Sequence, residues 1–296
     1  MSVTRRTVRK GLAAAAATSV TGVSKALARE RKTPPADAVG MLYDATRCIG
    51  CKACMVKCRE ANNLPPETDA KLGAIYDAPD DLSAFTMNVI KLYREGNRFS
   101  YMKAQCMHCV DPACASVCMI GAFKKGRKGV VSYDPAKCVG CRYCQIACPF
   151  NIPKYEWNTP FPKIVKCEMC RNRLAEGKLP ACVEACPREA VIFGGLEDLK
   201  ADARGRLAAE PGRYYPKVYG ETDGGGTQVL YLSAAGIPFE KLGLPDLGDK
   251  PVPELSETLQ HAIYRGFIAP VVLYGALGVV IYRNRKKPSG EEEGEE

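Results

Sequence analysis

The sixteen cysteines of the 296-residue chain stand in four separate runs of four. The first and third runs read C-x2-C-x2-C-x3-C, the second reads C-x2-C-x4-C-x3-C, and the fourth reads C-x2-C-x11-C-x3-C. In chain order the runs are Cys48, Cys51, Cys54 and Cys58; Cys106, Cys109, Cys114 and Cys118; Cys138, Cys141, Cys144 and Cys148; and Cys167, Cys170, Cys182 and Cys186. Thiols grouped this closely either bind metal as thiolates or pair as disulfides.

The spacing favours iron-sulfur clusters over both disulfides and zinc. Two residues between ligands let successive sulfurs reach three corners of one cubane, and C-x2-C-x2-C-x3-C is the bacterial ferredoxin run, whose last cysteine ligates the neighbouring cluster. A disulfide framework rarely groups every cysteine so tightly, and a zinc ribbon builds one tetrahedral site from paired C-x2-C knuckles. All sixteen cysteines are therefore predicted to bind iron, in four 4Fe-4S clusters.

Few other side chains suggest chemistry of their own. Only two histidines are present, so haem ligation within the chain is not expected. His108 lies inside the second run and either donates a hydrogen bond near a cluster sulfur or caps its loop, which we favour; His261 either faces a quinone or, as we favour, simply lies at an interface. The chain carries no phosphate-loop or dinucleotide fingerprint and no C-x3-C-x2-C run of a radical enzyme. An iron-sulfur enzyme acting alone is therefore not favoured.

Basic residues inside or beside the runs leave two interpretations open, because they either screen cluster charge or face solvent. They are Lys52, Lys57, Lys103, Lys137, Arg142 and Lys166. The whole chain carries a net charge of +9, but without residues 1–28 it keeps 37 basic and 33 acidic residues, or +4. Clusters with four thiolates are anionic, so a mildly basic protein suits them. Nucleic acid is not required as a partner.

The cysteine runs lie in an internal repeat. Tyr43-Asp44 precedes the first run as Tyr133-Asp134 precedes the third, and the segment 112–118 matches the segment 180–186. The first pair of segments lies 90 residues apart and the second pair 68, so the first copy carries 22 extra residues, between residues 59 and 103. The repeat predicts a duplicated, loop-rich ferredoxin-like domain of the α+β class over residues 29–200, with a small apolar core that depends on its clusters.

The elements expected to position the cysteines are short. Strands are predicted over 40–43, 130–133 and 190–193, and a short helix after the third cysteine of each run. A helix follows to about residue 210, and residues 224–227 are expected to turn into a strand over 228–232. Residues 201–260, rich in glycine, proline and tyrosine, are interpreted as an extended arm wrapped over the domain or a partner.

The two ends of the chain suggest export and membrane attachment. Residues 1–28 combine Arg5-Arg6, an apolar stretch and a small-residue cleavage site, as in a twin-arginine signal peptide. Residues 266–282 carry no charge and are followed by four basic residues, which predicts a single transmembrane helix over 261–283 with the charged tail 284–296 in the cytoplasm. A buried helix docking on a partner is the alternative.

Taken together, these motifs resemble the iron-sulfur subunits of the molybdopterin oxidoreductase family, such as the beta subunits of formate dehydrogenase and dimethyl sulfoxide reductase. Within that family the chain resembles the hydrogenase-2 branch of electron-transfer subunits. The resemblance rests on the four cysteine runs, the twin arginine, Met41-Leu42-Tyr43-Asp44, residues 105–112 and 140–144, Tyr219-Gly220-Glu221, residues 224–230 and the apolar C-terminal stretch.

The resemblance also implies how the cysteines are shared, since in this family the first run pairs with the fourth and the second with the third. The repeat alone would instead pair the first run with the second. The implied sets are, first, Cys48, Cys51, Cys54 and Cys186; second, Cys167, Cys170, Cys182 and Cys58; third, Cys106, Cys109, Cys114 and Cys148; fourth, Cys138, Cys141, Cys144 and Cys118. Some relatives have tryptophan at the position of Cys141 and hold a three-iron cluster there. Because this chain has cysteine at that position, four 4Fe-4S clusters are expected.

The function implied is that of a non-catalytic electron carrier. It would face the periplasm at the cytoplasmic membrane and link the small and large subunits of a nickel-iron hydrogenase to an integral-membrane quinone-binding subunit. The order from first to fourth set would run from the hydrogenase to the membrane. The alternative is the same role in a molybdopterin oxidoreductase such as formate dehydrogenase or a sulfur-compound reductase.

Overall fold

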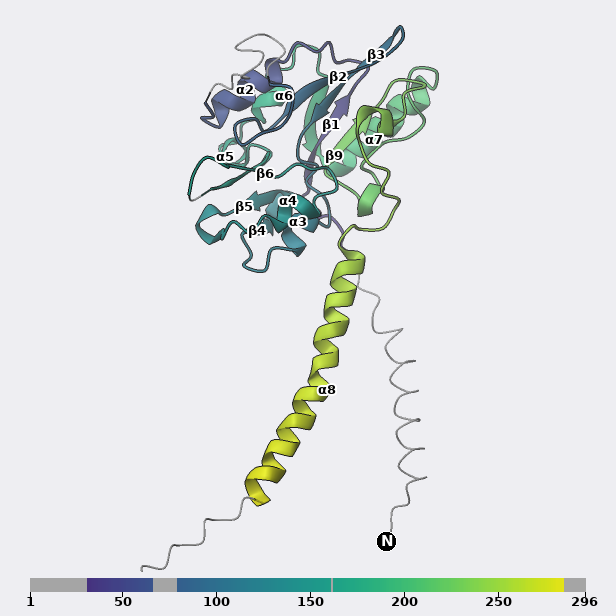
Figure 1. Cartoon of the computed structure of the whole chain (residues 1–296). Coiled ribbons are helices and arrows are strands. Elements are labelled where there is room, and N and C mark those ends of the chain that lie inside the picture. The colour runs from purple at the N-terminus through teal and green to yellow at the C-terminus, as the bar shows by residue number, and fades with distance from the viewer. Residues whose placement is uncertain (1–30, 66–78, 161, 285–296) are drawn as a thin grey trace, which may run out of the picture. The chain divides into compact units, whose positions relative to one another are not determined.

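The fold is that of a computed structural model, which describes residues 31–65, 79–160 and 162–284 (Figure 1). The signal peptide expected over 1–28 lies outside the described residues, as does the tail from residue 285 onward. Arg31–Pro253 forms one compact unit, and the C-terminal helix belongs to a second unit. All sixteen cysteines lie in the first unit.

A three-stranded sheet forms the framework of the compact unit. Its strands are β1 (Val39–Asp44), β8 (Val191–Gly195) and β9 (Val229–Leu232), in the order β8-β1-β9. The central strand β1 pairs antiparallel with β8 and parallel with β9, so that Leu42 stands opposite both Ile192 and Leu230. Strands this apolar are expected where both faces of a sheet are covered.

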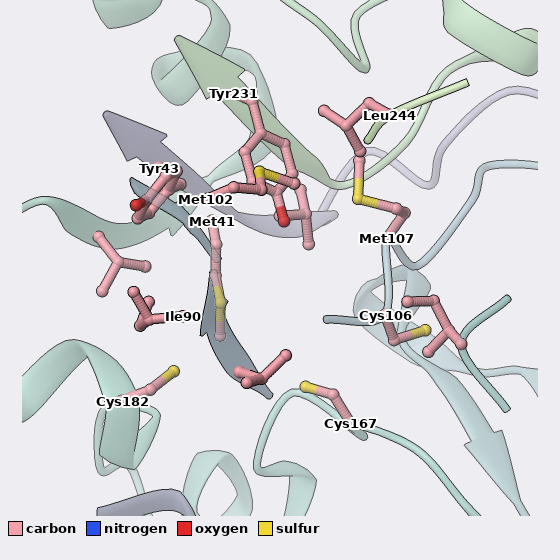
Figure 2. Packing of buried hydrophobic residues seen from close by; sticks show 14 of the residues in the cluster. Met41, Tyr43, Ile90, Met102, Cys106, Met107, Cys167, Cys182, Tyr231 and Leu244 are labelled. Atoms are coloured by element: carbon pink, nitrogen blue, oxygen red, sulfur yellow. The ribbon is translucent and has the colours of Figure 1, made fainter. Parts of the chain in front are cut away.

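The sheet separates two layers, because successive side chains of a strand point to opposite faces. Leu42 and Leu230 pack on one face against helix α7 (Leu196–Ala209). Met41, Tyr43 and Tyr231 point to the other face, where they join a core that contains many of the cysteines (Figure 2). One side of the sheet therefore supports the site and the other anchors it to a helix.

Short elements on the cysteine side carry or support the runs. Three hairpins are present, and helices α2 with α6 and α3 with α4 form two contacting pairs (Figure 1). The hairpins are β2 (Val89–Glu95) with β3 (Arg98–Ala104), β4 (Phe123–Lys125) with β5 (Val131–Tyr133), and β6 (Lys154–Tyr155) with β7 (Ile164–Val165). The helices are α2 (Ala53–Ala61), α3 (Ala113–Ser116), α4 (Tyr143–Ala147), α5 (Arg171–Ala175) and α6 (Ala181–Glu184), with 3₁₀ turns at Arg127–Gly129, Pro135–Lys137, Asp223–Gly225 and Phe239–Leu242.

The expected strands and the helix before residue 210 are confirmed, but the position of the short helices was wrong. Each begins before the third cysteine of its run instead of after it. In the first and third runs the cause is a residue in the left-handed region, Lys52 with φ 58° and Arg142 with φ 65°. This conformation reverses the chain within one residue, so the helix starts at once and carries Cys54 or Cys144 on its first turn.

The segment expected as an extended arm contributes to the framework. Strand β9 is hydrogen-bonded to β1 in the central sheet. The glycine-rich turn before β9 contacts the second cysteine run, where the Val110 amide donates to the Gly226 carbonyl (2.9 Å) and the Gln228 amide to the Met107 carbonyl (3.1 Å). The segment thus holds a ligand loop against the sheet.

The C-terminal unit contains helix α8 (Glu254–Asn284), with Pro270 inside it. Within the described residues, no helix combines the length and the apolar character needed to cross a membrane. This finding does not support the transmembrane helix expected over 261–283.

Candidate iron-sulfur centres

Backbone amides converge on the sulfurs of the cysteine loops. Two residues after the first cysteine of three runs, an amide donates to its Sγ: Gly50 to Cys48 (3.5 Å), Gly140 to Cys138 (3.4 Å) and Met169 to Cys167 (3.3 Å). All three donor residues have positive φ, between 54° and 70°, so the turn aims the amide back at the sulfur. Hydrogen bonds to ligand sulfurs are one of the means by which a protein sets a cluster's potential.

The last cysteine of a run receives a second type of bond. The Ala122 amide donates to Cys118 Sγ (3.2 Å) and the Ala190 amide to Cys186 Sγ (3.3 Å), in each case four residues on. Cys148 accepts equivalently from Ile152. The same geometry recurs in three runs, which is the structural counterpart of the repeat in the sequence.

The structure brings the first run and the end of the fourth run together. Cys48, Cys51, Cys54 and Cys186 line one cavity, beside Tyr43 and Lys103. Burial raises the pKa of the Cys54 thiol to about 12, and the anionic forms of Cys182, Cys48 and Cys186 add to the rise.

The end of the first run lies with the rest of the fourth. Burial raises the pKa of Cys58 to about 12, and Cys182 and Cys170 raise it further. Burial likewise raises the pKa of Cys167 well above its usual value, helped by Cys58 and Cys182. These four thiols therefore form a second group on helices α2 and α6 and the loop before α5.

The two middle runs combine in the same way. Burial raises the pKa of Cys109 strongly, with Cys106, Cys148 and Cys114 as its charged neighbours. The fourth group surrounds Cys144. Burial raises the pKa of that thiol to about 12, and Cys138, Cys141 and Cys118 contribute.

The arrangement suits 4Fe-4S clusters. Thiolates are the iron-binding form, so iron entering these sites displaces protons from thiols whose pKa is raised. Among the described residues, no three metal-binding side chains surround a single ion site. A cubane needs no such site, because each of its four irons takes one cysteine.

The four groups also interact with one another in a series. Cys54 of the first group interacts with Cys182 of the second. Cys167 of the second interacts with Cys106 of the third, and Cys114 of the third interacts with Cys144 of the fourth. Figure 2 shows the middle of this series, with Cys182, Cys167 and Cys106 below the side chains of Met41 and Tyr231.

Buried cations lie beside these groups, and two of the six basic residues near the runs are placed to screen cluster charge. Lys103 and Lys166 are buried, with 1% and 3% of their surface exposed. Burial by itself lowers the pKa of Lys103, but the anions of Cys182 and Cys54 outweigh it, so that the pKa is raised. Lys57 and Lys137 instead reach solvent and pair with nearby carboxylates.

Arg142, also near a run, is exposed and stacks over Trp157 at 4.0 Å from the ring centroid. Trp157 itself is 68% exposed.

Lys125 is a residue that the sequence did not single out. It donates to the carbonyls of Cys109 (2.8 Å) and Gly129 (2.9 Å) and to Gln228 Oε1 (2.7 Å). Burial lowers its pKa to about 8, against the opposing effect of Cys109 and Cys106. Its position on strand β4, seven residues beyond the second run, gives no local signal of burial.

His108 supports its loop, and the hydrogen bond to a cluster sulfur stays a prediction, because among the described residues its buried Nε2 has no hydrogen-bond partner. Its Nδ1 accepts from the Val131 amide at 3.0 Å, which fixes the second run to strand β5. Burial lowers its pKa well below the usual value, and the neighbouring ammonium groups of Lys166 and Lys125 lower it further. The ring is therefore neutral at physiological pH, with its proton on Nε2.

Only two of the sixteen thiols are on exposed residues, Cys51 in the first group and Cys141 in the fourth. Exposed apolar residues lie close to both in sequence. Ile49 is 55% exposed and lines the same cavity as Cys51, and Val139 and Ile146, two positions before and five after Cys141, are 72% and 81% exposed.

Comparison with known proteins gives concordant matches. Residues 97–196 match the 4Fe-4S dicluster domain. The chain is 43% identical over 294 residues to the hydrogenase-2 operon protein HybA of Escherichia coli O157:H7, with 88% of each chain covered. It is 36% identical over 267 residues to the formate dehydrogenase iron-sulfur subunit of Haemophilus influenzae, covering 87% of this chain and 84% of that one. The formate dehydrogenase-O iron-sulfur subunit of Escherichia coli K12 is 36% identical over 245 residues, covering 80% and 78%.

Proposed function

This chain belongs to the family of four-cluster iron-sulfur electron-transfer subunits found in hydrogenase and formate dehydrogenase complexes, and we propose from that premise that it links a periplasmic nickel-iron hydrogenase to a membrane quinone-binding subunit. It is a non-catalytic subunit whose cofactors are four 4Fe-4S clusters. When bound, each cluster supplies reversible electron transfer at a potential set by its charge, hydrogen bonds and burial. The polypeptide supplies the spacing between clusters and their environment.

We assign each cluster to one of the four ligand sets given above. Support comes from the thiols that interact within each set, as in the cavity lined by Cys48, Cys51, Cys54 and Cys186. Charge interactions link each set to the next, through Cys54 and Cys182, Cys167 and Cys106, and Cys114 and Cys144. This order makes the first and fourth clusters the ends of the relay.

The exposure of Cys51 and Cys141 is the observation that carries the proposal. A relay must reach the surface at two points, one for each partner, and the exposed ligands belong to the two terminal sets. Apolar side chains around both positions suit contact with a partner protein. Following the family resemblance, the hydrogenase small subunit contacts the Cys51 region and the quinone-binding subunit contacts the Cys141 region.

We place the protein on the periplasmic face of the cytoplasmic membrane, on the strength of the twin-arginine pattern in residues 1–28. A membrane-impermeant amine reagent added to intact spheroplasts should then label exposed lysines of the cluster-binding unit, such as Lys57 and Lys137. The competing assignment is the same role in a formate dehydrogenase or sulfur-compound reductase. The large subunit that purifies with the chain in detergent distinguishes the two, and the higher identity to the hydrogenase-2 operon protein favours the first.

The decisive experiment replaces the ligand at the proposed membrane-side exit. In the complete complex, Cys141→Ser should damage one cluster and abolish hydrogen-driven quinone reduction. Hydrogen oxidation with a soluble dye, which takes electrons upstream, should remain largely intact. Lys137→Ser is the matched control, because Lys137 is exposed and adjoins the ligand Cys138 without being one; it should retain both activities. Equal loss of both activities in Cys141→Ser would contradict the role of a relay.

A further inference from the structure

We propose that Lys103 is the resident counter-ion of the first and second clusters and raises the reduction potentials of both. This inference rests on the proposed assignment of ligand sets. It concerns a positioning residue that binds no iron itself.

The burial of Lys103 is the first observation. The side chain leaves strand β3 and is 1% exposed. Its ammonium group donates to the side-chain oxygen of Gln105, which is also buried. An amide oxygen is a neutral acceptor, and an ammonium ion removed from water costs several kcal/mol unless an anion is nearby.

The second observation is the nature of its charged neighbours. In the part of the chain that the structure describes, no carboxylate forms an ion pair with Lys103, and the anionic groups that act on it most strongly are cysteines. One of them, Cys54, belongs to the first set. The others belong to the second set and are Cys182, Cys167 and Cys58. A single cation thus lies between two ligand sets.

Lys166, a second buried lysine, differs from Lys103 in its hydrogen-bond acceptors. The ammonium group of Lys166 donates to the carbonyl oxygens of Val131 and Cys167, and it acts on Cys114 and Cys148 of the third set. Within the described residues, Lys103 donates to no backbone carbonyl, and its hydrogen bond goes to the side chain of Gln105. The clusters themselves are therefore the anions that balance its charge.

The effect on potential follows from electrostatics. A cluster becomes more negative when it gains an electron, and a fixed positive charge at low dielectric favours the more negative form. Net charge and burial are among the factors that set cluster potentials. Lys103 lines the cavity of the first set and interacts with the charges of the second, so its charge should raise those two potentials and leave the fourth unaffected.

The test is a redox titration of the intact, anaerobically purified complex, followed by electron paramagnetic resonance. Signals of the terminal clusters are first assigned by their loss in Cys51→Ser and in Cys141→Ser. Lys103→Met removes the charge and keeps the apolar stem, whereas Lys103→Arg keeps the charge. Lys57→Met is the matched control: it removes the same charge next to the ligand Cys58, but from an exposed side chain paired with Glu60 at 2.7 Å.

Lys103→Met should lower the potential of the Cys51-dependent cluster, making its reduction at least tenfold less favourable, which is about 59 mV for one electron. The Cys141-dependent cluster should keep its potential, and Lys103→Arg and Lys57→Met should behave as the unaltered complex does. An unchanged Cys51-dependent potential, an equal shift of the Cys141-dependent cluster, or the same shift in Lys57→Met would each overturn the proposal.

If Lys103→Met loses clusters, the pattern of the loss tests the counter-ion role. Loss confined to the first and second clusters, with the Cys141-dependent signal retained, supports the counter-ion role. Loss of all four signals overturns it, because it would indicate a general structural role. Failure of the relay assignment itself would show earlier, as fewer than about sixteen irons per unaltered chain or no cluster lost in Cys141→Ser.

Discussion

At the scale of single residues, the dipeptide Tyr-Asp precedes both the first and the third cysteine runs, but its two aspartates have different environments. The hydroxyls of Tyr43 and Tyr133 each lie beside the first thiol of the following run, Cys48 or Cys138. The aspartates that follow these tyrosines differ. Asp44 is fully buried, whereas the side chain of Asp134 is 44% exposed and accepts from the Ala136 amide at 3.1 Å.

This difference predicts unequal effects of the same substitution. Asp44 binds Arg206 at 3.1 Å, the Tyr214 hydroxyl at 3.0 Å and Thr46 Oγ1 at 2.6 Å. Asp44→Asn leaves the partly buried guanidinium with only Asp202 as its anion, and should cost about 2 kcal/mol of unfolding free energy, below the value for a fully uncompensated charge.

The cluster-loaded Asp44→Asn protein should therefore unfold roughly 4–8 °C lower than the unaltered one in an anaerobic thermal scan. Asp134→Asn is the control from the other repeat copy. It should change stability by no more than about 0.5 kcal/mol, because asparagine caps a turn as well as aspartate does. A similar fall in both variants would show that the Asp44 network adds nothing.

The cysteines were predictable from sequence because cluster chemistry fixes ligand spacing locally. Their sharing between runs was not predictable from spacing, and came only with the family resemblance. The burial of Lys103 and Lys125 left no local signature either, since lysine is mostly exposed and only the fold decides which one is enclosed. A loop role for His108 was predictable from its place inside the second run, but its acceptor bond to the Val131 amide was not, because that bond joins residues 23 positions apart.

At the scale of elements, the join between β1 and β9 is the tightest backbone approach near the site. A Cβ at Gly40 would lie 2.4 Å from the Gln228 carbonyl oxygen, the acceptor of the Met41 amide at 2.9 Å. Gln228 also holds Lys125 through its side chain. A methyl group at position 40 would therefore push β9 away from β1 and disturb the second cysteine run.

Gly40→Ala should destabilise the cluster-loaded protein by about 1–3 kcal/mol, as overpacking does. Gly205 in helix α7 provides the control, because a Cβ there meets nothing within 4 Å. Gly205→Ala should stabilise the protein by about 0.5–1 kcal/mol through the helix preference of alanine. Anaerobic thermal scans of both variants compare the two signs directly, and a stabilised Gly40→Ala would refute the close packing of β1 and β9.

The strands of this framework were predictable because each is a short apolar run next to turn residues. The arrangement of β9 was not, since pairing between Leu42 and Leu230 joins residues far apart in sequence, and a glycine-rich segment looks like an arm until its partner strand is known. Helix starts were misplaced for a local reason, since the left-handed conformations of Lys52 and Arg142 occur at residues that rarely adopt them.

At the scale of the whole molecule, the compact unit is organised around its cofactors. Its strands are short, and the core on the cysteine side includes Cys54, Cys106, Cys167 and Cys182 among its buried residues. Without iron, the thiols of this layer lose the clusters that hold them together, so removing the metal should unfold the unit.

Anaerobic treatment of the purified chain with a strong iron chelator should therefore abolish most strand and helix signal in circular dichroism. The stripped unit should become open to protease cleavage throughout residues 31–253, while a sample incubated without chelator resists. Reconstitution with iron and sulfide should restore both properties. Native circular dichroism in iron-free protein would contradict this dependence.

The place of β1 at the centre of its sheet has a consequence for biosynthesis. This strand leaves the ribosome before any of the cysteines, yet its neighbours β8 and β9 come after the last of them. The sheet cannot close until residue 232 has been made, so every ligand loop is translated while the framework is still open on both edges. Enzymes that deliver iron and sulfide thus have access to all sixteen thiols up to the final step, when two late strands seal the loaded sites.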